Sequence, residues 1–536
     1  LADVERLSAS YPNAASDFFG TLSSPPCVLK TGRPWSVGQE SRPIIREIHP
    51  VRHDHPIEAI WSDLLVKLCT LFDERNVSWT SIDPVAVAEV GKGTICPLLL
   101  WIGVRRASLS YKDACTAAEA ATSLLTGSGL DDFEIAFRET VVIHCLRPDP
   151  PQPTVPSGIS LEESSMFAFC KPFTHLLGLP ISSSAGDGTG ALYLRDSKDS
   201  DQLYLLTCSH VVRPEKDDSS LPHREGFHET IHAPGPDVHY DAYPKLLAAC
   251  LLISPFLKFL SLSDSAIWRL AAQQTQRPQW NNSVEFVNDH LDFQRFKVSK
   301  PQAQAQASQA SNFNVSMFQL RASRPQSSSF TIGLSINIAK NPAQYDEDWA
   351  TIKLDKDKFD SATFKGNQVF VDKNSSDYEM LMYPNNNDRQ NLVCPENGLL
   401  PVSKVISEDE FSKLQHLTKD GEKCVFVLKN GRTTGTTYGS CSKLESISRT
   451  YYDGEVVEPK SIAIFSHSND ESASSFADLG DSGSIVLTRD GRILGILTSI
   501  VRNAHTKKTD ITYITPFWFI MEQIRKEYPN TACMFS

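Results

Sequence analysis

The chain has 536 residues, of which 40% are apolar and 22% are charged, and its formal net charge is −12. This length exceeds that of one ordinary domain, and the composition is typical of a globular protein rather than a fibre or a disordered tail. The negative charge argues against a nucleic-acid partner, because most of the surface would repel a phosphate backbone.

The sequence also predicts no membrane span, no metal site and no cofactor. The longest apolar run, Leu246 to Leu257, is well short of the roughly 20 residues that a bilayer requires. The 12 cysteines include no Cys-x-x-Cys pair and no Cys/His cluster at ligand spacing. The first residues do not resemble a signal peptide, and no cysteine closely flanks Ser482, which favours a cytoplasmic or other intracellular compartment.

The first part of the chain predicts a small α+β unit behind a loosely ordered arm. Residues 1–45 are rich in Ser, Pro and Gly and show no clear period, as expected for the arm. Residues 46–146 show the periods of helices and strands. The expected elements are a helix over 56–72, strands over 85–90 and 96–104, a helix over 111–125 and a strand over 133–143.

A change of texture follows a proline-rich segment, residues 147–160, which predicts a linker. Few contacts should cross such a linker, so we expect residues 1–150 to form a separate regulatory or partner-binding domain that the chemistry does not need. The alternative is a unit that packs permanently on the barrel as a structural wing. Residues 161–536 contain short β-rich runs between Gly, Asp and Ser turns, as in an all-β barrel. Within them, residues 213–345 predict an insertion with a helical pair and a Gln/Ala/Ser-rich stretch.

The strongest local motif is Gly480-Asp481-Ser482-Gly483-Ser484, which lies before two β-rich runs. Glycines allow a tight turn that directs the N–H groups of Gly480 and Ser482 at one oxyanion. Ser482 is therefore a candidate nucleophile. A Gly/Asp/Ser turn that only joins two strands has the same pattern.

A nucleophilic serine needs a base that is held by a rigid element. His210 meets this condition because it directly follows the predicted strand 203–207. A lone histidine after a strand is more often a structural residue. The base role becomes favoured once the order of the motifs along the chain is considered.

Four motifs resemble those of trypsin-like serine proteases of the PA clan. Residues 206–212 resemble the histidine motif, in which a strand ends in Thr, a small residue and His, and residues 480–484 resemble the serine motif. Residues 495–500 resemble the substrate-lining strand of HtrA-type members. Residues 431–435 resemble the hairpin that precedes the serine loop in intracellular, often fungal, trypsin-like proteins. The motifs occur in the family's order, and the resemblance covers residues 160–536.

The resemblance implies a mainly β fold, a chymotrypsin-like double β-barrel with a partly helical insertion, preceded by the small α+β unit. It implies a serine endopeptidase that hydrolyses protein or peptide substrates through a His-Asp-Ser triad and an acyl-enzyme. A catalytically inactive protease fold retained for binding is the alternative. An α/β-hydrolase esterase fits less well, because the motif spacing and the order of the triad both differ.

The third triad residue should be a carboxylate between His210 and Ser482 in the chain. Asp348 fits best, because it is followed by Trp-Ala and an alternating strand and so resembles the family's aspartate motif. Asp264 and Asp346 are the alternatives. Asp264 lies within the expected insertion, where a triad residue would be poorly placed.

By the same resemblance, Phe476 forms the base of the primary specificity pocket, which Thr498, Ser499 and Ile500 also line, and the Thr498 hydroxyl bonds the aspartate. Neither Phe476 nor Ile500 can pair with a basic side chain, so we expect small or medium apolar residues before the cleaved bond. No free N-terminus near residue 160 is available to pair with Asp481. We therefore do not expect activation by N-terminal cleavage, as occurs in digestive zymogens.

Overall fold

The computed structural model describes residues 19–145, 177–212, 332–335 and 345–535, with gaps inside these ranges of which the longest are 90–97 and 355–365. The predicted linker, Asp264 and the two helices expected in the insertion lie outside the described residues. The protein is mainly β. Among the described residues, no helix has both the length and the apolar character of a membrane span.

The N-terminal unit contains the helices and strands that the periodicity predicts. Ser110 begins one of its helices, because the Ser110 side chain accepts a hydrogen bond from the N–H of Asp113. The strands form one sheet in the order β1-β7-β6-β5-β4. The elements are β1 (Cys27–Lys30), β4 (Arg46–Pro50), η1 (Pro56–Ala59), α2 (Trp61–Glu74), β5 (Trp79–Glu89), β6 (Leu98–Val104), α3 (Tyr111–Gly127) and β7 (Phe133–His144).

One part of the expected loose arm is ordered. All four residues of β1 are buried, and the strand pairs antiparallel with β7. The prediction of a loosely ordered arm over residues 1–45 is therefore wrong for this segment, because an edge of β7 offers its backbone groups a partner.

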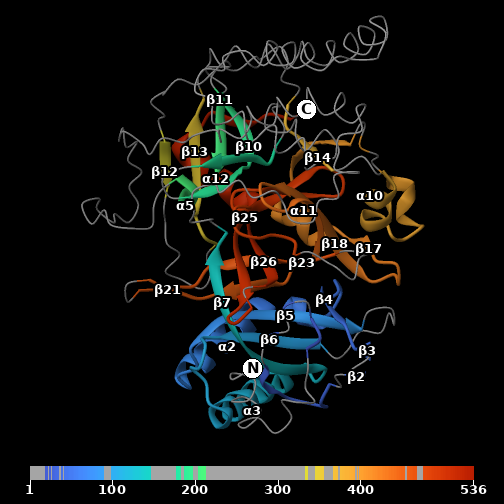
Figure 1. Ribbon diagram of the computed structural model, residues 1–536, viewed down its shortest axis with the longest axis vertical. Helices are drawn as coiled ribbons and strands as arrows, with labels where there is room; N and C mark the ends of the chain where they lie inside the picture. The colour runs from blue at the N-terminus through green and yellow to red at the C-terminus, as the bar shows by residue number, and fades with distance from the viewer. Residues whose placement is uncertain are drawn as a thin grey trace, which may run out of the picture.

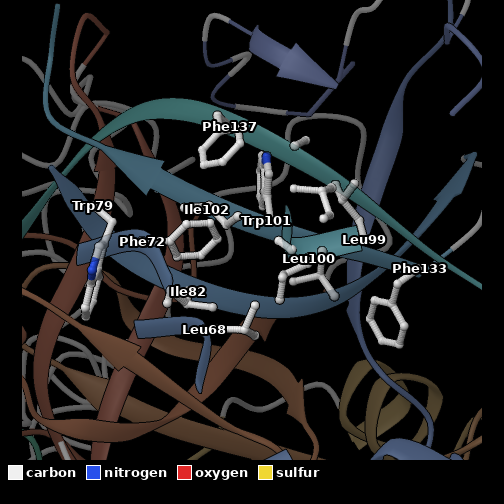
Figure 2. Close-up of a cluster of buried hydrophobic side chains, with 14 of the residues drawn as sticks. Leu68, Phe72, Trp79, Ile82, Leu99, Leu100, Trp101, Ile102, Phe133 and Phe137 are labelled. Carbon is white, nitrogen blue, oxygen red and sulfur yellow. The ribbon is translucent and has the colours of Figure 1, made fainter. Parts of the chain in front are cut away.

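The core of this unit lies between helix α2 and the sheet. Leu68 and Phe72 of α2 lie in one cluster with Ile82 of β5, Ile102 of β6 and Phe137 of β7, as Figure 2 shows. The rings of Phe72 and Phe137 meet edge to face with 5.8 Å between their centroids. Burial of each such side chain contributes about 1.5–3 kcal/mol.

Six strands in the C-terminal part close into a ring. Their antiparallel pairings run β18-β19-β23-β26-β25-β24 and return to β18. The ring leaves no free edge between these strands, as in a closed barrel. The strands are β18 (Lys423–Gly431), β19 (Gly435–Cys441), β23 (Lys460–Ser466), β24 (Ile485–Thr488), β25 (Arg492–Asn503) and β26 (Thr509–Pro516).

A second sheet packs beside this ring. Its order is β12-β13-β11-β10-β27, and the pairings among the described residues leave it open. Its apolar side chains share one core with residues of β24, β25 and helix α12. The sheet and its neighbours comprise β8 (Leu179–Ser182), β9 (Asp187–Gly190), β10 (Leu192–Asp196), β11 (Leu203–Thr207), α5 (Ser209–Val212), β12 (Ile332–Ser335), β13 (Trp349–Lys353), α12 (Phe517–Glu527) and β27 (Thr531–Cys533).

Short elements complete the described part of the chain, and all eight of its cysteines are free. These elements are β2 (Gly38–Gln39), β3 (Arg42–Pro43), β14 (Gln368–Phe370), α10 (Ser375–Met382), η4 (Asp388–Asn391), β15 (Leu399–Pro401), β16 (Lys404–Val405), α11 (Glu408–Lys413), β17 (His416–Leu417), β20 (Glu445–Ser448), β21 (Thr450–Tyr452) and β22 (Glu455–Val457).

The N-terminal unit and the ring share one sheet. The last residues of β7, Thr140 to His144, pair antiparallel with Asn503 to Ser499 of β25, and β5 pairs with β20. Figure 1 shows β7 running from the N-terminal unit to β25. The expectation that few contacts cross between the two regions is therefore wrong. A proline-rich segment does not prevent the strands before it from pairing with strands after it, so it does not predict how many contacts the two regions make.

Buried charges also join the two regions. The Arg138 guanidinium lies 2.6 Å from Asp510 and 3.5 Å from Asp83, and it stacks 3.3 Å above the ring of Trp101. Asp83 also accepts a hydrogen bond from the hydroxyl of Tyr513 at 2.6 Å. Buried polar contacts thus join the N-terminal unit to β26.

A chain that begins at Ser157 tests this continuity. It should be insoluble, because β20 and part of β25 lose their strand partners and an apolar core face becomes exposed. Its soluble fraction and its circular dichroism during thermal unfolding are the measurements. Co-expression with a chain that ends at Cys145 should restore a soluble complex. Cooperative unfolding of the Ser157 chain alone would show that the shared sheet is dispensable.

Candidate active site

The turn before β24 holds Ser482 in a conformation that only glycine neighbours permit. Gly480 and Gly483 have φ values of +98° and +87°. A Cβ atom on Gly480 would lie 2.4 Å from the Thr433 hydroxyl, and one on Gly483 would lie 2.2 Å from the Thr189 carbonyl oxygen. Any larger residue would therefore push the serine out of place.

His210 lies between Ser482 and Asp348. It stands in α5, the single helical turn that follows β11, as the predicted strand requires. Its Nε2 atom is 2.7 Å from Ser482 Oγ, and its Nδ1 atom is hydrogen-bonded to Asp348 Oδ2. The three predicted residues thus form one hydrogen-bonded chain.

Strand pairing brings Asp348 to this position. Asp348 directly precedes β13, which pairs antiparallel with β11 so that Ala350 lies opposite Thr207. Asp348 Oδ1 accepts hydrogen bonds from the Ser209 hydroxyl at 2.5 Å and from the His210 N–H at 3.1 Å. The hydroxyl that bonds Asp348 is therefore that of Ser209, whereas the resemblance had assigned this role to Thr498.

The electrostatics separate Asp348 from its alternative Asp346. Burial alone would raise the pKa of Asp348, but the His210 charge and hydrogen bond hold that pKa below its usual value. Burial, followed by the charge of Asp348, raises the pKa of Asp346 to about 7. Asp348 is thus the ionised partner of His210 at neutral pH.

The two N–H groups expected to form an oxyanion hole face the carbonyl oxygen of Cys145. The Gly480 N–H donates to this oxygen at 2.5 Å and the Ser482 N–H at 3.5 Å. The N–H of Cys145 donates in turn to the Thr498 carbonyl at 3.3 Å. Thr498 therefore takes part in the site through its backbone carbonyl, which binds the N–H of Cys145. Cys145 is a site residue that the sequence did not predict.

The predicted pocket residues are buried around the same segment. Phe476 and Ile500 lie in one apolar cluster with the Cys145 side chain, and Ser499 pairs with His144 across the two strands. The His144 ring stacks on that of His210, with 4.4 Å between centroids and 12° between planes. His144 and Cys145 thus lie over His210 and Ser482, and Ser482 is 0% exposed.

Asp481 has a buried cation as its partner. Lys429 Nζ lies 3.4 Å from Asp481, and both side chains are fully buried. Asp481 also accepts hydrogen bonds from the Thr433 N–H and the Thr434 hydroxyl, both at 2.7 Å. Burial lowers the pKa of Lys429, whereas the charge of Asp481 opposes that shift. A lysine therefore anchors the serine loop where a free chain terminus had been considered.

One cluster of potential metal ligands occurs in the described part of the chain, formed by His144, His210 and Asp348. Their donor atoms lie within 4.8 Å of one another. Both ring nitrogens of His210 already have hydrogen-bond partners, Asp348 and Ser482. A metal ion at His210 would have to break these two hydrogen bonds.

Local sequence signals could have identified only some of the missed residues. Ser209 lies within the histidine motif, and Lys429 lies two residues before the hairpin motif. His144 ends a strand that the periodicity does predict and Cys145 follows it, but no local pattern identifies β25 as the partner of that strand.

Comparisons with known proteins give only distant likenesses. No sequence-family profile and no curated protein matches the chain. Thermobifida fusca protease A is 11% identical with a TM-score of 0.28, over 65% of this chain and 95% of that one. A glutamic-acid-specific serine protease, described as binding substrate through a histidine triad, is 10% identical with a TM-score of 0.28, over 67% and 99%. Cellulomonas bogoriensis chymotrypsin is 17% identical with a TM-score of 0.21, over 39% and 76%. Overlays this loose do not establish a shared fold, so any function must come from the geometry of the site.

Replacing the buried lysine tests its role as the anchor of the serine loop. Lys429→Met should lower the free energy of unfolding by about 3 kcal/mol, because Asp481 is left buried without its cation. Lys423→Met is the matched control, since Lys423 lies at the same 3.4 Å from Asp54 but its side chain is 38% exposed. The control should change the stability by less than about 1 kcal/mol. Chemical denaturation measures both values. If the two substitutions lower the free energy of unfolding equally, Lys429 does not anchor the serine loop.

Proposed function

We propose that the protein is a serine endopeptidase in which Ser482 is the nucleophile, His210 the general base and Asp348 the residue that orients the base. The main support for this proposal is the continuous chain of hydrogen bonds from Asp348 through His210 to Ser482 Oγ. Neutral histidine can accept the serine proton at Nε2 only if Nδ1 carries its own proton. The carboxylate of Asp348 favours that tautomer.

The proposed reaction uses the site as follows. His210 takes the Ser482 proton as Oγ attacks a peptide carbonyl, and the N–H groups of Gly480 and Ser482 stabilise the resulting oxyanion. His210 then protonates the leaving amine. In the second half of the reaction, His210 takes a proton from a water molecule as the water attacks the acyl-enzyme. His210 then returns a proton to Ser482 Oγ, which restores the enzyme.

We assign the fold to the chymotrypsin-like double barrel, with the closed ring as one half and the open sheet as the other. The triad supports this assignment, because His210 and Asp348 come from the open sheet and Ser482 from the ring. Residues 161–536 then form the protease domain, as the intracellular trypsin-like resemblance implies. Residues 46–146 form a wing on the ring.

The proposed substrates are proteins or peptides with a small or medium apolar residue before the cleaved bond. Phe476 and Ile500 are 2% and 0% exposed and leave no partner for a basic side chain. The alternative, an inactive fold that only binds, would have no need of the bonds between His210 and Asp348. Reactivity of Ser482 separates the two functions.

A fluorophosphonate probe tests the nucleophile, because only an activated serine reacts quickly. Ser482→Ala should abolish labelling, and Ser482→Ala or His210→Ala should each lower ester turnover by roughly 10⁴ to 10⁶. Ser412→Ala, which changes an exposed helical serine, is the control. Because His144 and Cys145 cover the site, labelling is also measured in Ile143→Pro, in which proline opposes the pairing with β25. If neither the native chain nor Ile143→Pro is labelled, the proposed protease function is excluded.

The carboxylate is tested separately. Asp348→Asn should keep the fold but lower turnover by about 10⁴, because the amide favours the wrong tautomer of His210. Turnover is measured in Ile143→Pro chains so that access to the site does not limit it. Asp264→Asn should be near neutral. If Asp264→Asn is the inactive variant and Asp348→Asn is not, Asp348 is not the triad residue.

A further inference from the structure

Residues 140–145 of the chain itself lie along β25 and reach Ser482, and we call the place that they occupy the groove. Residues 140–144 lie extended and antiparallel to residues 503–499 of β25, in unbroken register from Thr140 with Asn503 to His144 with Ser499. An extended peptide that adds a strand to a sheet edge is a common form of peptide recognition, in which main-chain bonds supply affinity and side-chain pockets supply specificity. This segment of β7 therefore has the form of a bound peptide.

The carbonyl of Cys145 lies where a carbonyl under attack must lie. Its oxygen faces the N–H groups of Gly480 and Ser482, at 2.5 Å and 3.5 Å. These are the donors that would hold the oxyanion. The Cys145 N–H is held by Thr498 at 3.3 Å, so the peptide is fixed on both sides of the Cys145 α-carbon. On the side of the serine, Ser482 Oγ is already bonded to His210.

The side chains fit this arrangement as well. The Cys145 side chain is buried in the apolar cluster that contains Phe476 and Ile500. The His144 ring stacks on His210, so the residue before Cys145 covers the catalytic base. Both side chains thus have defined places relative to the triad. A strand that merely ended near the site would not require a buried Cys145 side chain or a His144 ring stacked on His210.

We propose that the protein cleaves its own peptide bond between Cys145 and Leu146, and that the fragment ending at Cys145 remains in the groove as an inhibitor. This inference rests on the proposed serine protease function. It assigns a substrate, the chain itself, and a regulatory state, a protease closed by its own product.

Ser482 Oγ bonds to the carbonyl carbon of Cys145 while its proton passes to His210. The bond from that carbon to the Leu146 nitrogen breaks, and His210 gives the proton to the departing amine. A water molecule then attacks the Cys145–Ser482 ester through His210. The products are a Cys145 carboxylate, a free Leu146 amine and an intact Ser482.

The fragment should stay bound after cleavage. It keeps the pairing of β7 with β25 and of β5 with β20, and its core includes Ile447 of β20 and Tyr513 of β26. The new carboxylate faces the two N–H donors that held the carbonyl. Because the groove is filled within one chain, cleavage should be intramolecular.

The test compares the full native chain with Ser482→Ala by mass spectrometry after denaturation. The native chain should give two fragments, one ending at Cys145 and one beginning at Leu146, which elute as one complex from gel filtration in native buffer. Ser482→Ala should stay whole, and it should remain whole when mixed with the native protein. Ser412→Ala, which changes an exposed helical serine, should be cleaved like the native chain. Cys145→Trp should be cleaved at least about 100-fold more slowly, because the bulky ring does not fit the pocket.

Each other outcome overturns the proposal. Cleavage of Ser482→Ala, or cleavage at a different bond, would assign the cut to another protease or another site. Separation of the fragments in native buffer would remove the inhibitor role. A native chain that stays whole would refute self-cleavage. If the Ile143→Pro variant of that chain still labels with fluorophosphonate and hydrolyses peptides, the proposed protease function is retained. If neither the native chain nor Ile143→Pro labels or hydrolyses peptides, both proposals are refuted.

Discussion

Strand β25 is longer than its neighbour β24, and this difference shapes the protein. Residues 485–487 of β24 pair with residues up to Ile496 of β25, whereas residues 499–503 extend past β24 and need another partner. An unpaired edge of that length would attract other strands. β7 supplies the partner, and it thereby ties the N-terminal unit to the ring and brings Cys145 to Ser482. The fold and the covering of the site follow from one backbone requirement.

Polar groups at the site are buried but satisfied. Asp348 receives three hydrogen bonds, from the Ser209 hydroxyl, the His210 N–H and the His210 ring. Asp481 has Lys429 and the amides of the adjoining hairpin. Buried charges are costly unless they are paired in this way, so the pairs restrict the serine loop and the base to one geometry.

The sequence was sufficient for the residues whose chemistry is local. Ser482 needs glycines beside it, and His210 and Asp348 each adjoin a strand, so short motifs identify them. Most N-terminal elements were predictable from periodicity for the same reason, although β1 was not. Lys429, His144 and Cys145 were missed because their roles come from contacts with residues far along the chain. No period within β7 shows that its last five residues will leave β6 and continue along β25.

The long separation between β7 and β25 has a consequence for synthesis. β7 ends at His144, and β25 begins only at Arg492. The N-terminal unit must therefore wait, with an edge of β5 and the end of β7 unpaired, until nearly the whole chain has been made, and contacts this distant form slowly. When β25 does form, β7 is already present on the same chain at high effective concentration. The groove is then filled as it folds, so a newly made molecule never displays an open cleft to other proteins in its surroundings.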